Sequence, residues 1–231
     1  MELLECIDIT KNFGSKEVLK DINLTIPKGK IIGLLGKNGM GKSTLIKLMN
    51  DLLTPTSGKI LVNGKEIGVE SKNVIAYLPE RSYLDKSMTV EKTIKFFEDF
   101  YDDFDSKKAK KLFNELELDI TQKLSQMSKG MQEKVQLVLV MSRKAKLYIL
   151  DEPLGGVDPA TRDYILDTII NNVNKGSSVL ISTHLISDIE RILDEVIFID
   201  KGKIILQSDV TLLRKKENGS IDEIFRRMFK C

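Results

Sequence analysis

The chain carries the stretch Gly36-Lys37-Asn38-Gly39-Met40-Gly41-Lys42-Ser43, which matches the phosphate-loop pattern G-x-x-x-x-G-K-S. The apolar run Ile31–Leu35 before it is typical of a strand buried on both faces, and a helix is expected to begin near Lys42. Glycines allow successive backbone N–H groups to turn inward around phosphate oxygens, and the helix adds the positive end of its dipole. The stretch therefore predicts a phosphate site at a strand-to-helix turn.

The last residues of this stretch carry the chemistry of the predicted site. Lys42 can reach the β- and γ-phosphates, the hydroxyl of Ser43 can ligate Mg²⁺, and Thr44 offers a further donor. The alternative, a chance glycine turn, is disfavoured because the spacing, the preceding strand and the following helix agree. We therefore expect bound phosphates together with Mg²⁺.

A second element of the site is the acid pair Asp151 and Glu152, which ends the apolar strand predicted over residues 147–150. A carboxylate at the end of a buried strand beside a phosphate loop is placed to hold the hydration shell of Mg²⁺, which suits Asp151. Glu152 would then face the reacting phosphate and orient or deprotonate the attacking water. The competing interpretation is a pair of strand-end acids in solvent, and the phosphate loop makes it the weaker one.

The chain contains a single histidine, His184, which follows the apolar residues 179–181 and the small pair Ser182 and Thr183. This position is the carboxyl edge of a strand, where ligands of α/β sheets bind. A lone histidine is often a satisfied structural group. Here its location favours a hydrogen bond to the γ-phosphate or to its leaving oxygen.

The second half of the chain alternates between strands and helices. Strands are expected over 147–150 and 178–181, with a helix from Pro159 to about residue 173, capped by Asp158. This alternation implies a parallel sheet with right-handed crossovers. Residues 196–206 are expected to form a hairpin.

The first third of the chain has the pattern of short strands, over residues 3–9, 18–26 and 59–62, separated by glycine-containing turns. Near the other end, Ser220 and Glu223 form a capping box before a short apolar helix face, which is expected to dock on its own domain.

Residues 80–144 have a helical pattern instead. An apolar stripe recurs at steps of four and three, formed by Val90, Ile94, Phe97, Tyr101 and Phe104. The stripe is expected to pack in the core of a helical subdomain, and the alternative is that part of it lines a groove for a partner helix. The basic run at 107–111 is expected to be a solvated helix face.

Composition restricts the class of protein. With 231 residues, 42% hydrophobic and 30% charged, the chain is expected to form one large domain or two small ones that share a core. Lysine and arginine number 36 against 34 acids, so we expect no nucleic acid partner. Two cysteines, Cys6 and Cys231, indicate a reducing cytosol. No apolar stretch approaches the length of a membrane span, so another chain would have to supply one.

Together these residues resemble the ATP-binding subunit of an ABC transporter, over nearly all of residues 2–206. The stretch Met127-Ser128-Lys129-Gly130-Met131-Gln132 stands in the place of the family signature Leu-Ser-Gly-Gly-Gln. Ser128 and Gly130 match it, whereas Lys129 and Met131 depart from it. In this family the signature completes the ATP site of the opposing subunit, which implies a head-to-tail homodimer, or a heterodimer with a related subunit, around two ATP molecules.

The resemblance assigns further positions. Phe13 stands where an aromatic ring stacks on adenine, although a loop residue packed in the core is an alternative. Glu80 stands where the family usually has glutamine, and its carboxylate offers only acceptors, which suits Mg²⁺ or its water. Asp158 anchors the loop Gly155-Gly156-Val157 that crosses the dimer interface. The expected nucleotide contacts are Phe13, Gly36, Lys37, Asn38, Gly39, Met40, Gly41, Lys42, Ser43, Thr44, Glu80, Ser128, Gly130 and Asp158.

The expected fold class is α/β, a P-loop NTPase of ABC type with a mixed core sheet, an N-terminal antiparallel β subdomain and an inserted helical subdomain. The core would comprise residues 1–79 and 145–208, the helical subdomain 80–144 and the tail 209–231. The resemblance implies an ATPase, with Glu152 and His184 catalytic and Ser43, Asp151 and Glu80 on the metal. It would act in the cytoplasm, peripheral on the inner face of the membrane, with a polytopic membrane subunit.

Two positions refine the expected function. Glu80 and the Ser-Lys-Gly-Met signature together resemble a bacterial exporter branch, which includes peptide and antibiotic efflux systems. The alternatives are a soluble ABC ATPase that acts on translation or DNA, and a regulatory module that binds ATP without hydrolysing it. Intact Asp151, Glu152 and His184 favour hydrolysis over the last of these.

Overall fold

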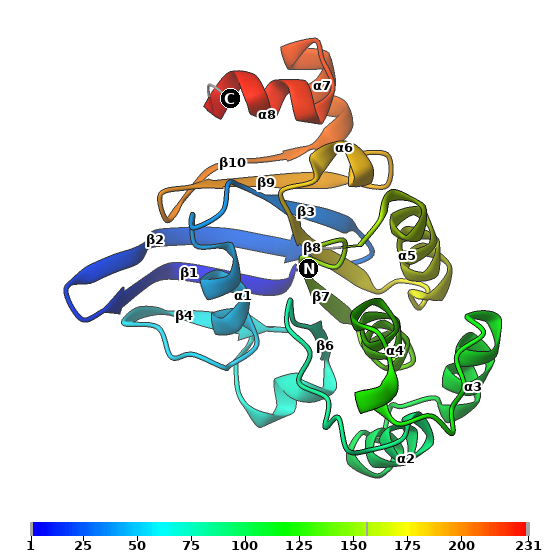
Figure 1. Cartoon of the computed structure of the whole chain (residues 1–231). Coiled ribbons are helices and arrows are strands. Elements are labelled where there is room, and N and C mark those ends of the chain that lie inside the picture. Colours follow the sequence, from blue (N-terminus) through cyan, green and yellow to red (C-terminus); the bar gives the residue numbers. More distant parts are fainter. Residues whose placement is uncertain (1, 156, 230–231) are drawn as a thin grey trace.

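The structure is a computed structural model that describes residues 2–155 and 157–229 (Figure 1). Two sheets form its centre within these ranges. The first has the strand order β2-β1-β4-β5 and is antiparallel, with bounds β1 Glu2–Phe13, β2 Lys16–Pro27, β4 Ser57–Val62 and β5 Lys65–Glu66. This sheet confirms the antiparallel N-terminal part expected from the short strands of the first third of the chain.

The second sheet is mixed and has the order β10-β9-β3-β8-β7-β6. Neighbouring strands are parallel except for the β9–β10 hairpin. The bounds are β3 Ile31–Leu35, β6 Ile75–Leu78, β7 Leu147–Asp151, β8 Ser178–Thr183, β9 Glu195–Asp200 and β10 Lys203–Asp209. Because β3, β7 and β8 lie side by side and parallel, the loops at their carboxyl ends meet at one edge of the sheet.

Helices cover the mixed sheet and form a separate group beside β6 (Figure 1). Their bounds are α1 Lys42–Met49, α2 Val90–Phe100, α3 Ser106–Glu115, α4 Lys129–Met141, α5 Pro159–Asn172, α6 Ile186–Ile189, α7 Val210–Glu217 and α8 Ile221–Phe229, with short 3-10 turns η1 Val69–Asn73 and η2 Leu124–Gln126. The expected cap of α5 is confirmed, because the carboxylate of Asp158 accepts the N–H of Thr161 at 3.0 Å.

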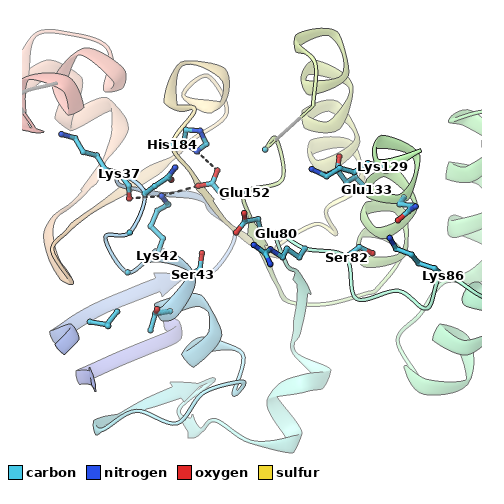
Figure 2. Close-up of a pocket in the computed structure, with 18 residues that line it drawn as sticks. Lys37, Lys42, Ser43, Glu80, Ser82, Lys86, Lys129, Glu133, Glu152 and His184 are labelled. Atoms are coloured by element: carbon cyan, nitrogen blue, oxygen red, sulfur yellow. Dashed lines mark hydrogen bonds and ion pairs between the residues drawn. The ribbon is translucent and has the colours of Figure 1, made fainter. Parts of the chain in front are cut away.

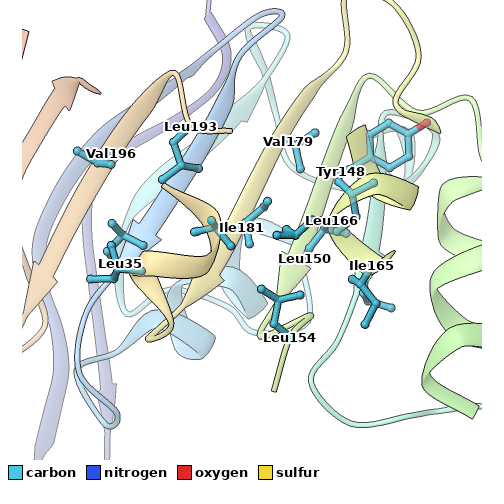
Figure 3. Close-up of a cluster of buried hydrophobic side chains, with 14 of the residues drawn as sticks. Leu35, Tyr148, Leu150, Leu154, Ile165, Leu166, Val179, Ile181, Leu193 and Val196 are labelled. Atoms are coloured by element: carbon cyan, nitrogen blue, oxygen red, sulfur yellow. The ribbon is translucent and has the colours of Figure 1, made fainter. Parts of the chain in front are cut away.

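Alternate side chains of the core strands enter two different hydrophobic clusters. Leu150, Ile181 and Val196 pack against α5 and α6 on one face of the mixed sheet (Figure 3). On the other face, Ile149 and Leu180 pack against α1 and the antiparallel sheet. Burial on both faces is why these strands are continuous apolar runs in the sequence.

A third cluster belongs to the helices between β6 and β7. It contains Val90, Ile94 and Phe97 of the apolar stripe, which confirms that the stripe packs in a core. One helix does not carry the whole stripe, however, since α2 ends at Phe100 and Tyr101 adopts an extended backbone. Tyr101 and Phe104 lie beyond the helix and are half-buried against the same cluster.

Arg143, just after α4, explains where α2 ends. Its guanidinium is buried, bonds both oxygens of Asp103 at 2.9 and 3.1 Å, and donates to the carbonyls of Ile75 and Lys72 at 2.9 Å each. The ring of Tyr101 lies 4.0 Å from the guanidinium carbon. Arg143 therefore joins the helical group to β6 and holds the residues after α2 in a turn.

The tail folds back onto the mixed sheet. The predicted capping box is confirmed, because the N–H of Ser220 donates to Glu223 at 2.8 Å and the N–H of Glu223 donates to the Ser220 hydroxyl at 3.2 Å. Ile221, Ile224 and Phe225 of α8 are buried in the core cluster, as expected for a docked face. Met228 is exposed and lies outside that contact.

Candidate functional site

The phosphate loop borders an open cleft of about 960 Å³ at the carboxyl edge of the mixed sheet (Figure 2). Residues from six segments line it, namely β2, the phosphate loop, the chain after β6, the start of α4, the chain after β7 and the chain after β8. The lining residues are Val18, Lys37, Asn38, Gly39, Gly41, Lys42, Ser43, Thr44, Glu80, Arg81, Ser82, Lys86, Lys129, Gln132, Glu133, Glu152, Gly155 and His184.

The phosphate loop has the backbone that its glycines were expected to provide. Gly41 has φ +105°, and a Cβ there would lie 2.7 Å from a Leu19 methyl, so no other residue type fits without a shift. Lys42 follows at the first position of α1, with its side chain only 5% exposed. Its Nζ donates to the carbonyl of Gly36 at 2.7 Å and to that of Lys37 at 3.4 Å, which folds the side chain over the loop.

Glu152 lies between the side chains of Lys42 and His184 in the cleft. Its Oε1 is 3.4 Å from Nζ of Lys42, and its Oε2 is 3.0 Å from Nδ1 of His184 (Figure 2). The backbone of Glu152 is left-handed, with φ +49°, a conformation that costs about 1–2 kcal/mol in a residue with a Cβ. Its N–H donates to the carbonyl of Ser182 at 3.0 Å, which fixes this turn. The structure thus brings Lys42, Glu152 and His184 together.

Asp151 is buried one residue earlier, at the end of β7. The hydroxyl of Ser182, opposite it on β8, donates to its Oδ1, and the hydroxyl of Ser43 lies 3.4 Å from the same oxygen. Burial raises the pKa of the Asp151 carboxyl above its ordinary value, and the nearby acids Glu152 and Glu80 add to the rise. Because both hydroxyl partners are neutral, the negative charge of an ionised Asp151 can be neutralised by a metal cation.

The signature segment begins α4 on the far side of the cleft. The hydroxyl of Ser128 caps the helix by accepting the N–H of Met131 at 3.2 Å. Lys129 and Glu133 line the cleft and lie 3.6 Å apart as an ion pair. Ser128 is exposed at the rim, and neither it nor Gly130 is among the residues that line the cleft of their own chain.

Among the remaining predicted contacts, Glu80 lines the cleft, whereas Phe13, Met40 and Asp158 do not. Phe13 ends β1 with 48% of its surface exposed and Lys11 Nζ lies 5.0 Å from its ring centre, so the alternative of a core-packed loop residue is wrong. Met40 belongs to the phosphate loop but does not line the cleft, and its carbonyl accepts the N–H of Gly202 at 3.2 Å. Glu80 is exposed in the cleft. Asp158 caps α5, and Gly156 of its loop lies outside the described residues.

Comparisons with known proteins agree with this geometry. A family model described as "ABC transporter" matches residues 19–155, which is more than half of the chain. The chain belongs to the ABC transporter ATP-binding family. This ABC ATPase is 33% identical to the ABC transporter ATP-binding protein YtrB of Bacillus subtilis (strain 168), over 93% of this chain and 74% of that protein. It is 31% identical to the lantibiotic transport ATP-binding protein SrtF of Streptococcus pyogenes, over 90% of this chain and 91% of that one.

A solved structure supports the fold of this ABC ATPase in the same way. It is described as the ATP binding subunit of an ABC transporter, and it superposes with a TM-score of 0.89 at 28% sequence identity, covering 98% of this chain and 99% of that chain. The family therefore gives ATP binding, and it implies a membrane subunit as partner. Within the described residues, none of the helices is both long and apolar enough to pass through a bilayer.

The oxygen donors beside the phosphate loop fit Mg²⁺. Mg²⁺ is usually held by one or two protein oxygens together with phosphates and water, and the Ser43 hydroxyl and the Asp151 carboxylate offer such a pair. Across residues 2–155 and 157–229, no cluster of three His, Cys, Asp or Glu side chains forms a cage that would hold a metal ion without phosphate. The donor set of this ABC ATPase therefore suits a metal that arrives with a nucleotide.

Sequence reasoning missed several residues of the cleft. Arg81, Ser82 and Lys86 line it from the segment between β6 and α2, which has no periodic pattern that would mark them. The contact of Ser182 with Asp151 depends on the pairing of β7 with β8, which the sequence does not specify. Its one signal was a small polar residue at the carboxyl end of an apolar strand.

Proposed function

We propose that this ABC ATPase hydrolyses ATP in the cleft of Figure 2 and drives export through a separate membrane subunit. The observation that carries the proposal is the position of Glu152 between Lys42 and His184. Lys42 and the loop N–H groups hold the β- and γ-phosphates, and Glu152 takes a proton from the water whose oxygen attacks the γ-phosphorus, as ADP leaves. General-base assistance of this kind is worth about 10²- to 10⁴-fold in rate.

His184 has a supporting role in this proposal. Its Nδ1 faces Glu152, so the opposite edge of the ring is free to bond the γ-phosphate while the carboxylate fixes the orientation of the imidazole. Ser43 and Asp151 would hold Mg²⁺, with Glu80 as a further acceptor in the cleft. The ion would supply neutralisation of phosphate charge when bound.

Two chains are needed for the complete site in this proposal. Ser128 is exposed at the start of α4, where its hydroxyl and the N–H of Gly130 can bond a γ-phosphate held by another subunit. Asp158 anchors the loop between the two subunits, and the exposed ring of Phe13 stacks on adenine. Two ATP molecules then lie between two signature helices, in a homodimer or in a heterodimer with a related subunit.

A groove beside the helical group is the proposed contact with the membrane subunit. It has a volume of about 420 Å³ and an apolar floor that includes Ile75 and Tyr77, with Tyr83 and Tyr101 on its wall. The expectation that the apolar stripe lines such a groove applies to Tyr101 alone among the five stripe residues. Lys47, Lys72 and Arg81 give the groove a cationic rim, which suits a cytoplasmic helix with acidic residues.

The division of the chain follows from these roles. Residues 1–79 and 145–208 bind the nucleotide, and residues 80–144 pass its movement to the membrane subunit. Of the tail 209–231, the described residues 209–229 pack on the core of the mixed sheet. The chain then acts at the inner face of the membrane. Export is favoured over import by Glu80 and by the signature of Ser128 to Met131, and it agrees with the similarity to the lantibiotic transport ATP-binding protein SrtF.

Phosphate release by the purified chain in Mg-ATP tests hydrolysis, and proteins that co-purify from detergent extracts test the partner. We expect release that Lys42→Met reduces at least about 100-fold, and a polytopic membrane protein in the extract. Lys59→Met is the matched control, because Lys59 is exposed on β4 away from the cleft. Equal release by wild type and Lys42→Met would contradict hydrolysis at this site.

A further inference from the structure

Helix α8 is capped at both ends by residues that lie far from it in the sequence, namely Lys37 of the phosphate loop and Glu190 at the end of α6. At its N-terminus, the N–H of Asp222 donates to Oε2 of Glu190 at 3.2 Å. At its C-terminus, the carbonyl of Phe229 accepts from Nζ of Lys37 at 3.2 Å. The first N–H groups and the last carbonyls of a helix have no partners within it, and its dipole favours an anion at the first end and a cation at the second. Both caps have the favourable sign.

Of the two capping residues, Lys37 lines the cleft and Glu190 is the C-cap residue of α6. Lys37 is the second residue of the phosphate loop, and its side chain extends away from Lys42 and Glu152 toward the tail (Figure 2). Glu190 directly follows α6, which begins two residues after His184. Oε1 of Glu190 also lies 3.4 Å from Arg214 of α7, so the tail holds both oxygens of this carboxylate.

Between its ends, α8 packs against α6 and β9. Ile221 and Ile224 are buried in the cluster that contains Ile186 and Ile189 of α6. The ring of Phe225 packs edge-on against Phe198 of β9, with ring centres 5.4 Å apart. A nine-residue helix spans about 13 Å and moves as a rod, so a shift at one end is carried to the other.

We propose that α8 couples the phosphate loop to the His184 loop, with Lys37 and Glu190 as positioning residues. The proposal rests on the proposed function, because it concerns ATP at that site. The ammonium of Lys37 is bonded to a neutral carbonyl and lines the cleft, so the phosphates of ATP compete with Phe229 for it through stronger, charge-assisted bonds. Binding of ATP therefore loosens one cap of α8. By reciprocity, the intact cap lowers the affinity for ATP.

A double-mutant cycle in the full chain tests whether α8 transmits between its two ends. Because the cap competes with ATP for Lys37, we expect Glu190→Ala, which loosens α8, to raise kcat/KM for Mg-ATP about 5-fold, and Lys37→Met, which removes a phosphate contact, to lower it about 5-fold. The double variant is expected to match Lys37→Met, and Lys37→Arg, which keeps a cation, is expected to retain the response to Glu190→Ala. A double variant in which the two effects multiply back to about the wild-type value would overturn the proposal, since independent sites add in free energy.

Two matched controls accompany the cycle. Lys201 lines the cavity between the β9–β10 hairpin and α8, and Arg191 directly follows Glu190 and pairs with Asp163. We expect the effects of Lys201→Met and Glu190→Ala on kcat/KM to multiply, as independent effects do. We expect the same of Arg191→Ala and Lys37→Met. Coupling of the same size in these pairs would overturn the proposal, because it would show a general loosening of the tail.

Hydrogen exchange gives a readout that needs only ATP binding. We expect Mg-ATP to speed the exchange of amides 224–229 in the wild type and to leave it unchanged in Lys37→Met, whose cap is already lost. The same response in both proteins would overturn the coupling. If the wild type released no phosphate, the proposed function would fail, whereas the exchange experiment would still decide the role of α8.

Discussion

Oε1 of Glu152 lies 3.4 Å from Nζ of Lys42, at the turn that follows β7. We propose that this cation holds the phosphates and that this carboxylate activates water, so the two groups are direct neighbours. Lys42 divides its donors between Glu152 and the carbonyls of the phosphate loop. Phosphate oxygens compete for the same donors, so we expect ATP binding to weaken the ion pair and to leave Glu152 available to a water.

Glu152→Gln is expected to abolish turnover while retaining ATP binding. The amide keeps the size and one acceptor oxygen but cannot take a proton from water, so phosphate release falls by about 10²-fold or more. Binding of a fluorescent ATP analogue and single-turnover phosphate release separate the two effects. Glu133→Gln, which changes an acid on the opposite wall of the cleft, serves as the control. Brisk hydrolysis by Glu152→Gln would remove Glu152 as the base.

Asp151→Asn is expected to stabilise the protein at neutral pH and to remove Mg-dependent turnover. Burial raises the pKa of Asp151, so the folded chain holds this proton more tightly than the unfolded chain does. Stability from this group is complete below the ordinary carboxyl range and is lost as the pH rises through the elevated pKa. Tm measured without nucleotide should therefore favour Asn at pH 7.5, by a margin that shrinks toward pH 4. A lower Tm for Asp151→Asn at pH 7.5 would contradict this sign.

Phe13→Ala is expected to raise KM for ATP and to leave kcat and Tm nearly unchanged. Stacking on a base is worth about 1–3 kcal/mol, which corresponds to roughly 5- to 100-fold in KM. Phe13→Tyr keeps a ring and should behave as wild type. Phe100→Ala is the control, because Phe100 is an exposed aromatic on α2 that does not line the cleft. A large fall in Tm without a change in KM would instead give Phe13 a structural role.

Arg143→Met is expected to lower the free energy of unfolding by about 3 kcal/mol, because it leaves Asp103 and two carbonyls without their partner. Lys144→Met is the matched control, since the neighbouring Lys144 is exposed and its pair with Asp105 is worth less than about 1 kcal/mol. Denaturant titration measures both. Equal losses in the two variants would show that Arg143 is not the joint between the helical group and the core.

The core strands were predictable because a strand that is buried on both faces has a run of apolar residues in its own sequence. Residues 147–150 and 179–181 are unbroken apolar runs, and the structure extends the predicted strands 147–150 and 178–181 by only one or two residues. The cap of α5 was equally local, since Asp158 precedes a proline that suits the first turn. Lys42, Glu152 and His184 could be placed in one site because each follows a strand of the same parallel sheet.

Contacts between distant segments were not predictable in the same way. The helical period continues through Tyr101 and Phe104, yet α2 ends at Phe100 because Arg143, far along the chain, binds Tyr101 and Asp103. The caps of α8 by Lys37 and Glu190 likewise require the tail to fold back over the sheet. Hydrophobic periodicity describes one helix or strand at a time. It does not show which distant residues contact the ends of that helix or strand.

We propose that two chains enclose ATP, with Ser128 of each completing the Lys42 site of the other. The most direct measurement is the molar mass of Glu152→Gln in saturating Mg-ATP by light scattering, together with the labelling rate of a cysteine placed at Ser128. We predict a dimer in Mg-ATP, a monomer without nucleotide, and slower labelling in the dimer. A strictly monomeric protein with Ser128→Cys labelled equally fast in both conditions would contradict the account.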